Sequence, residues 1–168
     1  MTLPKKIQQF LYKKLFQLKL TRKAFAQECG LPYTSLINLI NATQTNPALN
    51  SLLKIANYLN CSIDEMVGRK KYVLKKSNEI IQFQNLTIDD YNTNLRNFIC
   101  HKMQQHNLPA YKLGLNIGFS AAVIDNFANQ NRKNIQSNLG TAPIVALADY
   151  FAISVDEMIG RISRKTLI

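Results

Sequence analysis

The chain has 168 residues, a length that suits one large domain or two small ones. Hydrophobic residues make up 46% of the chain, which excludes an intrinsically disordered protein and favours a packed core. The formal net charge of +11 favours a polyanionic partner, nucleic acid before an anionic membrane, and no apolar run approaches the roughly 20 residues that span a bilayer.

The N-terminal segment is basic and amphipathic, and we interpret residues 4–18 as a first helix rather than a signal peptide. It has no continuous apolar core and no cleavage site of small residues. Pro4 suits a first helical turn. Apolar residues at helical spacing predict one inward face, made of Ile7, Phe10, Leu11, Leu15 and Leu18.

The segment from Thr21 to Asn41 carries two short apolar patterns separated by a glycine. Its inward positions are Phe25, Ala26, Cys29, Leu31, Leu36 and Leu39. Gly30 can adopt a positive φ at no steric cost, so it can end one helix and direct the next at a steep angle. Thr21 is expected to cap the first helix, and Pro32 to be the first residue of the second. The segment predicts a helix-turn-helix whose second helix can lie in a DNA major groove.

A polar loop over residues 41–46 precedes a further predicted helix over residues 49–59. The inward residues of this helix are expected to be Leu49, Leu52, Leu53, Ile55, Ala56 and Leu59. Ser62 and Glu65 have the spacing of a capping box, which predicts a short helix that begins there. Residues 1–71 are therefore predicted to form a first, DNA-binding domain, with eleven basic and three acidic residues.

Residues 72–92 are predicted to be a linker. Its apolar residues favour β-structure at irregular spacing, and they are Tyr72, Val73, Ile80, Ile81 and Phe83. The segment is expected to be a short hairpin or an extended linker, and an extended apolar linker would also offer a dimer contact.

The same plan returns in residues 93–168, and this internal repeat organises the chain. The sequence NCSIDEMVGR at residues 60–69 matches AISVDEMIGR at 152–161. The helix-turn-helix positions return at Leu113, Gly114, Ile117, Gly118, Phe119, Ile124 and Phe127. The offset is 88 residues from Gly30 to Gly118 and 92 from Gly68 to Gly160, so four extra residues lie between, in the loop NQNRKNIQSN. The first helix of this copy is expected over residues 93–105.

These residues resemble the Cro/CI-like (XRE-type) phage-repressor family of helix-turn-helix proteins, over residues 5–69 and less closely over 93–161. The most specific feature is the joint spacing of Ala26, Gly30, Leu36, Pro47, Ala56 and Glu65. The resemblance implies an all-α fold of two tandem five-helix lambda-repressor-like domains joined by a short, partly extended linker. Arg22 stands where the family usually has glutamine, and it should keep or strengthen a phosphate contact. Ile40 replaces a common acidic residue, which removes a usual salt bridge and predicts different packing at that end.

Outward residues of the predicted recognition helix are expected to contact bases, and they are Tyr33, Thr34, Ile37 and Asn38. Asparagine can pair with adenine, and threonine and isoleucine methyl groups can meet the thymine methyl, which suggests AT-containing half-sites. In the alternative, Ile37 and Ile40 pack against another subunit. Backbone contacts are expected from Thr21, Arg22 and Lys23 at a helix N-terminus, and from Asn41, Thr43, Gln44 and Asn46 after the recognition helix.

The second copy is a weaker candidate for DNA binding. Its candidate residues are Ala121, Ala122 and Asn126 on the helix and Arg132 and Lys133 in the longer loop. Asp125 on the same helix would repel phosphate unless it accepts a hydrogen bond from a cytosine amine. Residues 93–168 carry eight basic and four acidic residues. Two interpretations stay open: a second reader of DNA, or a scaffold for dimerisation.

No pattern predicts catalysis, a metal site or a cofactor. His101 and His106 do not share a helix face, and the chain has no CxxC, HExxH, P-loop or nucleophile-elbow motif. Two acid pairs are expected in first helical turns, where carboxylates stabilise the helix dipole: Asp64–Glu65 and Asp156–Glu157. Three widely spaced cysteines are expected to be small buried hydrophobic residues in a reducing cytoplasm: Cys29, Cys61 and Cys100.

Together these patterns predict a cytoplasmic bacterial or phage regulator of transcription that binds double-stranded DNA with sequence specificity, with repression favoured over activation. It would read the major groove through the first helix-turn-helix. One chain could act as a pseudo-dimer on two half-sites, but a homodimer is favoured, because one half-site of this size gives little specificity. The alternative is a protein-interaction module, an antitoxin or anti-repressor, whose helix-turn-helix surface binds a protein partner. A steep salt dependence of DNA binding would separate the first from the second.

Overall fold

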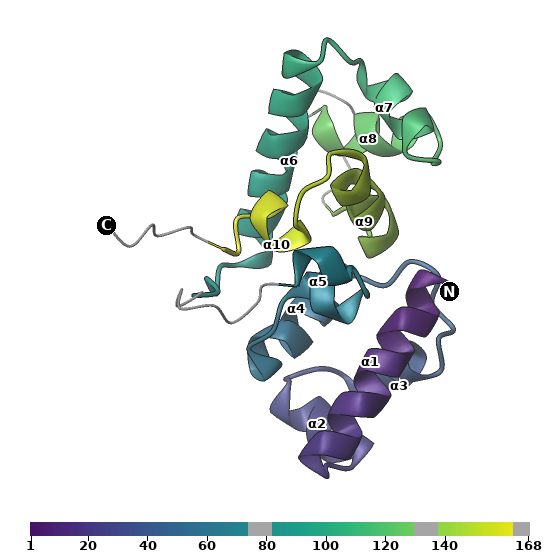
Figure 1. Cartoon of the computed structure of the whole chain (residues 1–168), viewed down its shortest axis with the longest axis vertical. Coiled ribbons are helices and arrows are strands. Elements are labelled where there is room, and N and C mark those ends of the chain that lie inside the picture. The colour runs from purple at the N-terminus through teal and green to yellow at the C-terminus, as the bar shows by residue number, and fades with distance from the viewer. Residues whose placement is uncertain (74–81, 130–137, 163–168) are drawn as a thin grey trace. The chain divides into compact units, whose positions relative to one another are not determined.

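The structure is a computed structural model that describes residues 1–73, 82–129 and 138–162, and in these ranges the regular elements are helices (Figure 1). The chain divides into two compact units, Met1–Phe83 and Gln84–Lys165, each with its own core.

The described residues of the first unit form five α-helices and one 3-10 turn. They are α1 (Leu3–Leu18), α2 (Arg22–Glu28), α3 (Tyr33–Ile40), α4 (Leu49–Leu59), α5 (Ile63–Met66) and the 3-10 turn Lys70–Tyr72. Helix α1 packs on both α3 and α5, and α2 packs on α3. The prediction of five helices over this part of the chain is confirmed, with their bounds within one residue or so of those expected.

Helix α1 forms because apolar residues recur along one side and Pro4 occupies its first turn. The buried residues are Ile7, Phe10, Leu11 and Leu15, as predicted. The prediction is wrong for Leu18, which is 42% exposed. The helix ends there, because Lys19 adopts the left-handed conformation (φ 53°) and turns the chain away from the core.

A glycine joins α2 to α3 with the expected geometry. Gly30 has φ +62°, and no atom lies within 4 Å of the place where a Cβ would stand, so the backbone conformation rather than space requires glycine. The Leu31 N–H donates to the Ala26 carbonyl at 2.9 Å and the Gly30 N–H to Gln27 at 3.1 Å. These two bonds form a Schellman motif, which satisfies the last carbonyls of α2. Pro32 occupies the N-cap position of α3, whereas it was expected to be the first residue of the helix.

The C-terminal end of α3 is buried within the first unit. Leu36, Leu39 and Ile40 are 0%, 3% and 0% exposed. The amide of Gln8 on α1 donates to the Ile40 carbonyl at 2.6 Å. The alternative that Ile40 packs against another subunit is therefore wrong, because its own unit already covers it. Apolar packing occupies the position where the family commonly has an acidic residue.

Helix α5 begins at the predicted cap, since the Ser62 hydroxyl accepts the Glu65 N–H at 2.9 Å. The Glu65 carboxylate lies 3.3 Å from the Lys14 ammonium of α1. Asp64 stands in the first turn as expected, but it is fully buried and paired with the Arg69 guanidinium. No local sequence pattern predicts this ion pair. The guanidinium also lies over the Tyr72 ring, 4.1 Å from its centroid, and the predicted β-preference of Tyr72 is wrong because it belongs to the 3-10 turn.

The described residues of the second unit also form five α-helices. They are α6 (Ile88–Gln105), α7 (Ala110–Asn116), α8 (Ala122–Ala128), α9 (Thr141–Tyr150) and α10 (Val155–Met158). Helix α7 packs on α8, α6 packs on both α8 and α10, and α9 packs on α10. The described residues of the predicted linker include no hairpin, whereas Ile80 and Ile81 lie outside the described residues.

Helix α6 starts five residues before the expected position, because Thr87 and Asp90 form a reciprocal capping box. The Thr87 hydroxyl donates to the Asp90 carboxylate at 2.6 Å, and the Asp90 N–H donates to the hydroxyl at 3.1 Å. The side-chain and backbone hydrogen bonds from Thr87 lower the pKa of Asp90. The last residues of the predicted linker, 88–92, are therefore helical.

The turn between α7 and α8 repeats the hydrogen bonds of the turn between α2 and α3. The Phe119 N–H donates to the Gly114 carbonyl at 3.0 Å, the Gly118 N–H donates to Leu115 at 3.0 Å, and Gly118 has φ +80°. Helices α7 and α8 approach more closely than a side chain allows, because a Cβ at Gly114 would lie 2.6 Å from the Ser120 carbonyl oxygen.

Gly114→Ala is therefore expected to destabilise the second unit. Alanine normally stabilises a helix interior by roughly 1 kcal/mol relative to glycine, but overpacking against fixed backbone costs about 1–3 kcal/mol. Urea denaturation followed by circular dichroism should show a lower midpoint. Ala26→Gly at the matching position of α2 is the control, and it should lose only about 0.5–1 kcal/mol from greater backbone freedom. A Gly114→Ala variant more stable than wild type would contradict the close approach.

Each unit contains a buried ion pair at its last α-helix, and the paired residues occupy matching positions of the internal repeat. In the second unit the Arg161 guanidinium lies 2.7 Å from the Asp156 carboxylate, and both side chains are 0% exposed. Ser154 caps α10 by accepting the Glu157 N–H at 3.5 Å. The repeated sequence DEMVGR/DEMIGR thus encodes the same local arrangement twice, with a carboxylate in the first turn and an arginine five residues later.

Candidate nucleic-acid interface

Helix α3 presents a polar surface on the side opposite its core residues. Tyr33, Thr34 and Asn38 are exposed, with Tyr33 at 50%. Ile37 is half-buried. Because Leu36, Leu39 and Ile40 anchor the other side, this surface is held at a fixed orientation relative to α2.

The N-terminus of α2 brings two exposed cations to the start of the helix-turn-helix. Arg22 and Lys23 are exposed, and the first turn contains no acidic residue. The Thr21 hydroxyl accepts the Ala24 N–H at 3.2 Å, which confirms the predicted cap and leaves the hydroxyl proton available as a donor. Positive side chains and helix-terminal N–H groups together favour an anion here.

The loop after α3 is also exposed, at Asn41, Thr43, Gln44 and Asn46. Thr43 already has an internal hydrogen-bond partner, because its hydroxyl and its N–H both donate to the Asn38 carbonyl of α3 at 3.2 Å. Ala42 has φ 53°, a left-handed conformation that directs the chain out of α3. Gln44 therefore offers a more adaptable contact than Thr43.

Two further side chains hold this surface in place. The Lys54 ammonium of α4 donates to the Gly30 carbonyl at 2.9 Å and so ties the turn to the next helix. Gln8 ties the end of α3 to α1 in the same way. The sequence carries no local signal for either contact, because each joins segments more than 20 residues apart.

The matching surface of the second unit differs in character. Ala121 and Ala122 are exposed, whereas Asp125 and Asn126 are half-buried. Helix α8 begins at Ala122, with Ala121 as the residue before its first turn. Arg132 and Lys133 lie outside the described residues.

Three further features bear on metal binding, cysteine reactivity and membrane insertion in the part of the chain that the structure describes. Among these residues no group of three or more His, Cys, Asp or Glu side chains is placed to hold a metal ion. Burial, and to a lesser extent Glu28, raises the pKa of the Cys29 thiol to about 12, so the thiol is protonated at neutral pH. Cys29 and Cys61 are buried as predicted, whereas Cys100 is half-buried. No helix within the described ranges has the length and apolarity needed to cross a membrane.

Comparisons with known proteins give consistent results for the N-terminal part of the chain. A family model described as Helix-turn-helix matches residues 11–66. An uncharacterized HTH-type transcriptional regulator of Rickettsia prowazekii, RP766, is 41% identical over 73 residues, which cover 42% of this chain and 79% of the relative. The uncharacterized HTH-type transcriptional regulator RC1195 of Rickettsia conorii is 40% identical over 73 residues, 42% of this chain and 67% of the relative. No solved structure matches significantly.

Proposed function

We propose, because the chain belongs to the XRE-type helix-turn-helix family of transcriptional regulators, that it binds double-stranded operator DNA and represses transcription from the promoter that it occupies. The observation that carries the proposal is the exposed polar side of α3, next to the exposed cations of α2. A helix-turn-helix of this kind uses its second helix to contact base edges in the major groove.

In this proposal α3 reads the bases through Tyr33, Thr34, Ile37 and Asn38. The exposure of Asn38 supports a bidentate contact to adenine, and the Thr34 methyl group suits a thymine methyl. Tyr33 is half exposed and offers both a ring and a hydroxyl to the groove. Ile37 contributes only through the part of its side chain that its own unit leaves uncovered.

Phosphate contacts come from both ends of the helix-turn-helix. Arg22, Lys23 and the Thr21 hydroxyl would hold one backbone strand, and Asn41, Thr43 and Gln44 would hold the other. Their exposure supports this assignment, and so does the absence of an acidic residue from the first turn of α2. Such contacts set the position of α3 in the groove but do not distinguish one sequence from another.

Two copies of the chain would occupy one operator. One α3 reads only a few base pairs, and symmetric dimers of such proteins bind half-sites about one helical turn apart. We propose a homodimer on this ground. The second unit, which resembles the first in the turn and in the buried ion pair, would be a second helix-turn-helix-like domain that serves either as a further reader or as a dimerisation scaffold.

The proposal is tested by measuring DNA affinity as a function of salt. Fragments of genomic DNA selected by the protein, and random duplexes of equal length, are titrated by fluorescence anisotropy at rising salt concentration. We expect a steep linear fall of log K with log salt and a preference of at least about 1000-fold for selected fragments. A flat salt response with no preference would contradict the proposal and favour the alternative, an antitoxin or anti-repressor that binds a protein.

Arg22→Ala/Lys23→Ala is expected to flatten the salt dependence without changing which sequence is preferred. Each lost phosphate contact should reduce the slope of log K against log salt by about 0.9, so the pair should reduce it by about 1.8. Lys13→Ala on α1 is the control, because it removes an exposed lysine that we place neither at the DNA nor at a dimer contact. An unchanged slope in the double variant would remove the N-terminus of α2 from the interface.

A further inference from the structure

The second helix-turn-helix has the backbone of the first but a different surface. The matching hydrogen bonds across the two turns agree within about 0.1 Å, as at Leu31 (2.9 Å) and Phe119 (3.0 Å). Gly30 and Gly118 both adopt positive φ. Positions 88 residues apart are therefore structurally equivalent, and their side chains can be compared one by one.

Each proposed DNA contact on α2 corresponds to an apolar residue on α7. Arg22 corresponds to Ala110 and Lys23 corresponds to Tyr111. The exposed Gln27 corresponds to Leu115. Tyr111 and Leu115 are each 57% exposed and lie one helical turn apart, so they form a continuous apolar stripe.

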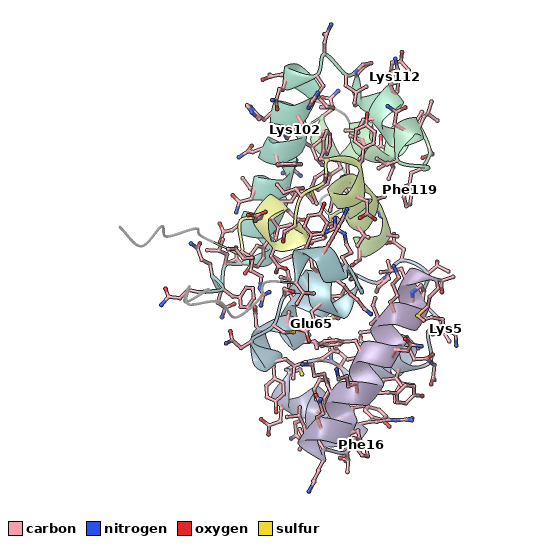
Figure 2. The ribbon with its side chains drawn as sticks, in the orientation of Figure 1. Lys5, Phe16, Glu65, Lys102, Lys112 and Phe119 are labelled. Carbon is pink, nitrogen blue, oxygen red and sulfur yellow. The ribbon has the colours of Figure 1, made fainter. Side chains whose placement is uncertain are left out.

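Two of the four proposed base readers on the recognition helix change in the same way, whereas Asn38 corresponds to Asn126, which is half-buried. The proposed base readers Tyr33 and Thr34 correspond to Ala121 and Ala122, which are exposed but too short to reach into a groove and carry no polar group. Ile37 corresponds to Asp125, a carboxylate that phosphate would repel. We call the surface formed by Tyr111, Leu115, Ala121 and Ala122 the α7–α8 face. Figure 2 labels Lys112 on α7 and Phe119 in the turn between α7 and α8.

We infer that the α7–α8 face binds the same face of a second copy of this chain, as a two-fold dimer interface. Exposed aromatic and aliphatic side chains at helical spacing are the groups that form the desolvated centre of such interfaces. The two alanines allow a second helix to approach closely.

The distribution of charge favours a second copy of this chain as the partner at the α7–α8 face. A chain of net charge +11 repels its own copies over most of its surface. The α7–α8 face itself is uncharged, and the groups beside it include both Lys112 and Asp125. A two-fold contact through this face therefore brings fewer like charges together than a contact through the more basic parts of the surface. The choice of a second copy also rests on the proposed function, since an operator of two half-sites requires two readers, and of the four proposed base readers the second unit keeps only the asparagine, as the half-buried Asn126.

The test is sedimentation velocity of the full chain over a range of concentrations. Tyr111→Lys/Leu115→Gln gives the α7–α8 face the residues found at the matching positions of α2. We expect wild type to dimerise at micromolar concentration and the double variant to have a dimer Kd at least about 100-fold higher. Its thermal midpoint should be unchanged, because both side chains are exposed.

A matched control makes the same chemical changes on the first unit. Tyr12→Lys/Phe16→Gln alters exposed residues of α1, where Tyr12 is 46% and Phe16 is 86% exposed, and should leave the dimer Kd unchanged. Ala122→Glu is a second probe that should also dissociate the dimer. A glutamate in the first turn of α8 favours the helix dipole, so loss of folding would not explain the result.

The outcomes separate this inference from the proposed function. A wild-type chain that stays monomeric to roughly 100 μM would overturn the inference, and so would a dimer that survives both α7–α8 variants. A dimer that dissociates as expected while the wild type shows no salt-dependent DNA binding supports the inference and contradicts the proposed function. If Tyr111→Lys/Leu115→Gln weakened binding to a single half-site duplex and left the dimer intact, the face would be a DNA surface instead.

Discussion

Asp156→Ala is expected to lower the free energy of unfolding of the second unit by about 3–5 kcal/mol. The substitution leaves the Arg161 guanidinium, which is 0% exposed, without its carboxylate partner at 2.7 Å. A buried charge that loses its partner keeps its full desolvation cost, and removing a partner is therefore far more costly than removing the pair. In the first unit, the loss of Asp64 would leave the buried Arg69 guanidinium without its carboxylate partner in the same way.

The measurement is urea denaturation of the full chain, with a double substitution that separates the two effects. Asp156→Leu/Arg161→Met removes both charges at similar volume and should recover most of the lost stability. Glu65→Ala is the control for an exposed ion pair, since Lys14 and Glu65 are 22% and 37% exposed, and it should cost no more than about 1 kcal/mol. If Asp156→Ala cost as little as Glu65→Ala, the role that we give the buried pair would be wrong.

Asn38→Ala is expected to have the largest effect on sequence preference. If Asn38 pairs with an adenine at two hydrogen bonds, its loss should weaken operator binding by about 1–3 kcal/mol, or roughly 5- to 150-fold. Non-specific binding and the salt slope should stay unchanged, because Asn38 carries no charge. This pattern is the opposite of that expected for Arg22→Ala/Lys23→Ala.

The experiment compares operator and random duplex at one salt concentration, and then single base-pair variants of the operator. The preference should relax at one position of each half-site when Asn38 is replaced. Asn97→Ala, on the exposed side of α6 in the second unit, is the control for the chemical change itself. A loss of affinity that is equal for operator and random duplex would assign Asn38 to the backbone rather than to the bases.

The helix-turn-helix was predictable because two independent signals agree at Gly30. The apolar spacing changes phase there, and the residue is one that adopts positive φ without strain. Outward residues of α3 then follow by subtraction, which correctly places Tyr33, Thr34 and Asn38 at the surface. Periodicity alone left Ile40 ambiguous, since a residue at the edge of an apolar stripe can be covered by its own unit or by a partner.

The rest could not be predicted, for reasons that differ between residues. The start of α6 was placed too late because β-favouring residues before it outweighed the short capping signal of Thr87 and Asp90. The ion pairs of Arg69 and Arg161 were missed because charged residues are mostly exposed, and only packing shows that these are not. The hydrogen bonds of Lys54 and Gln8 join segments that are far apart in the sequence, so no local sequence pattern predicts them.

The close approach at Gly114 bears on how a chain with two similar halves folds. During synthesis the first half is complete before the second, and related neighbouring segments can exchange partners and trap misassembled chains. A Cβ at position 114 would meet the Ser120 carbonyl oxygen at 2.6 Å. Helix α2 carries Ala26 at the equivalent position, so it cannot take the place of α7 against the second turn. The absence of a Cβ at position 114 thus favours packing of the second turn against α7 over packing against α2.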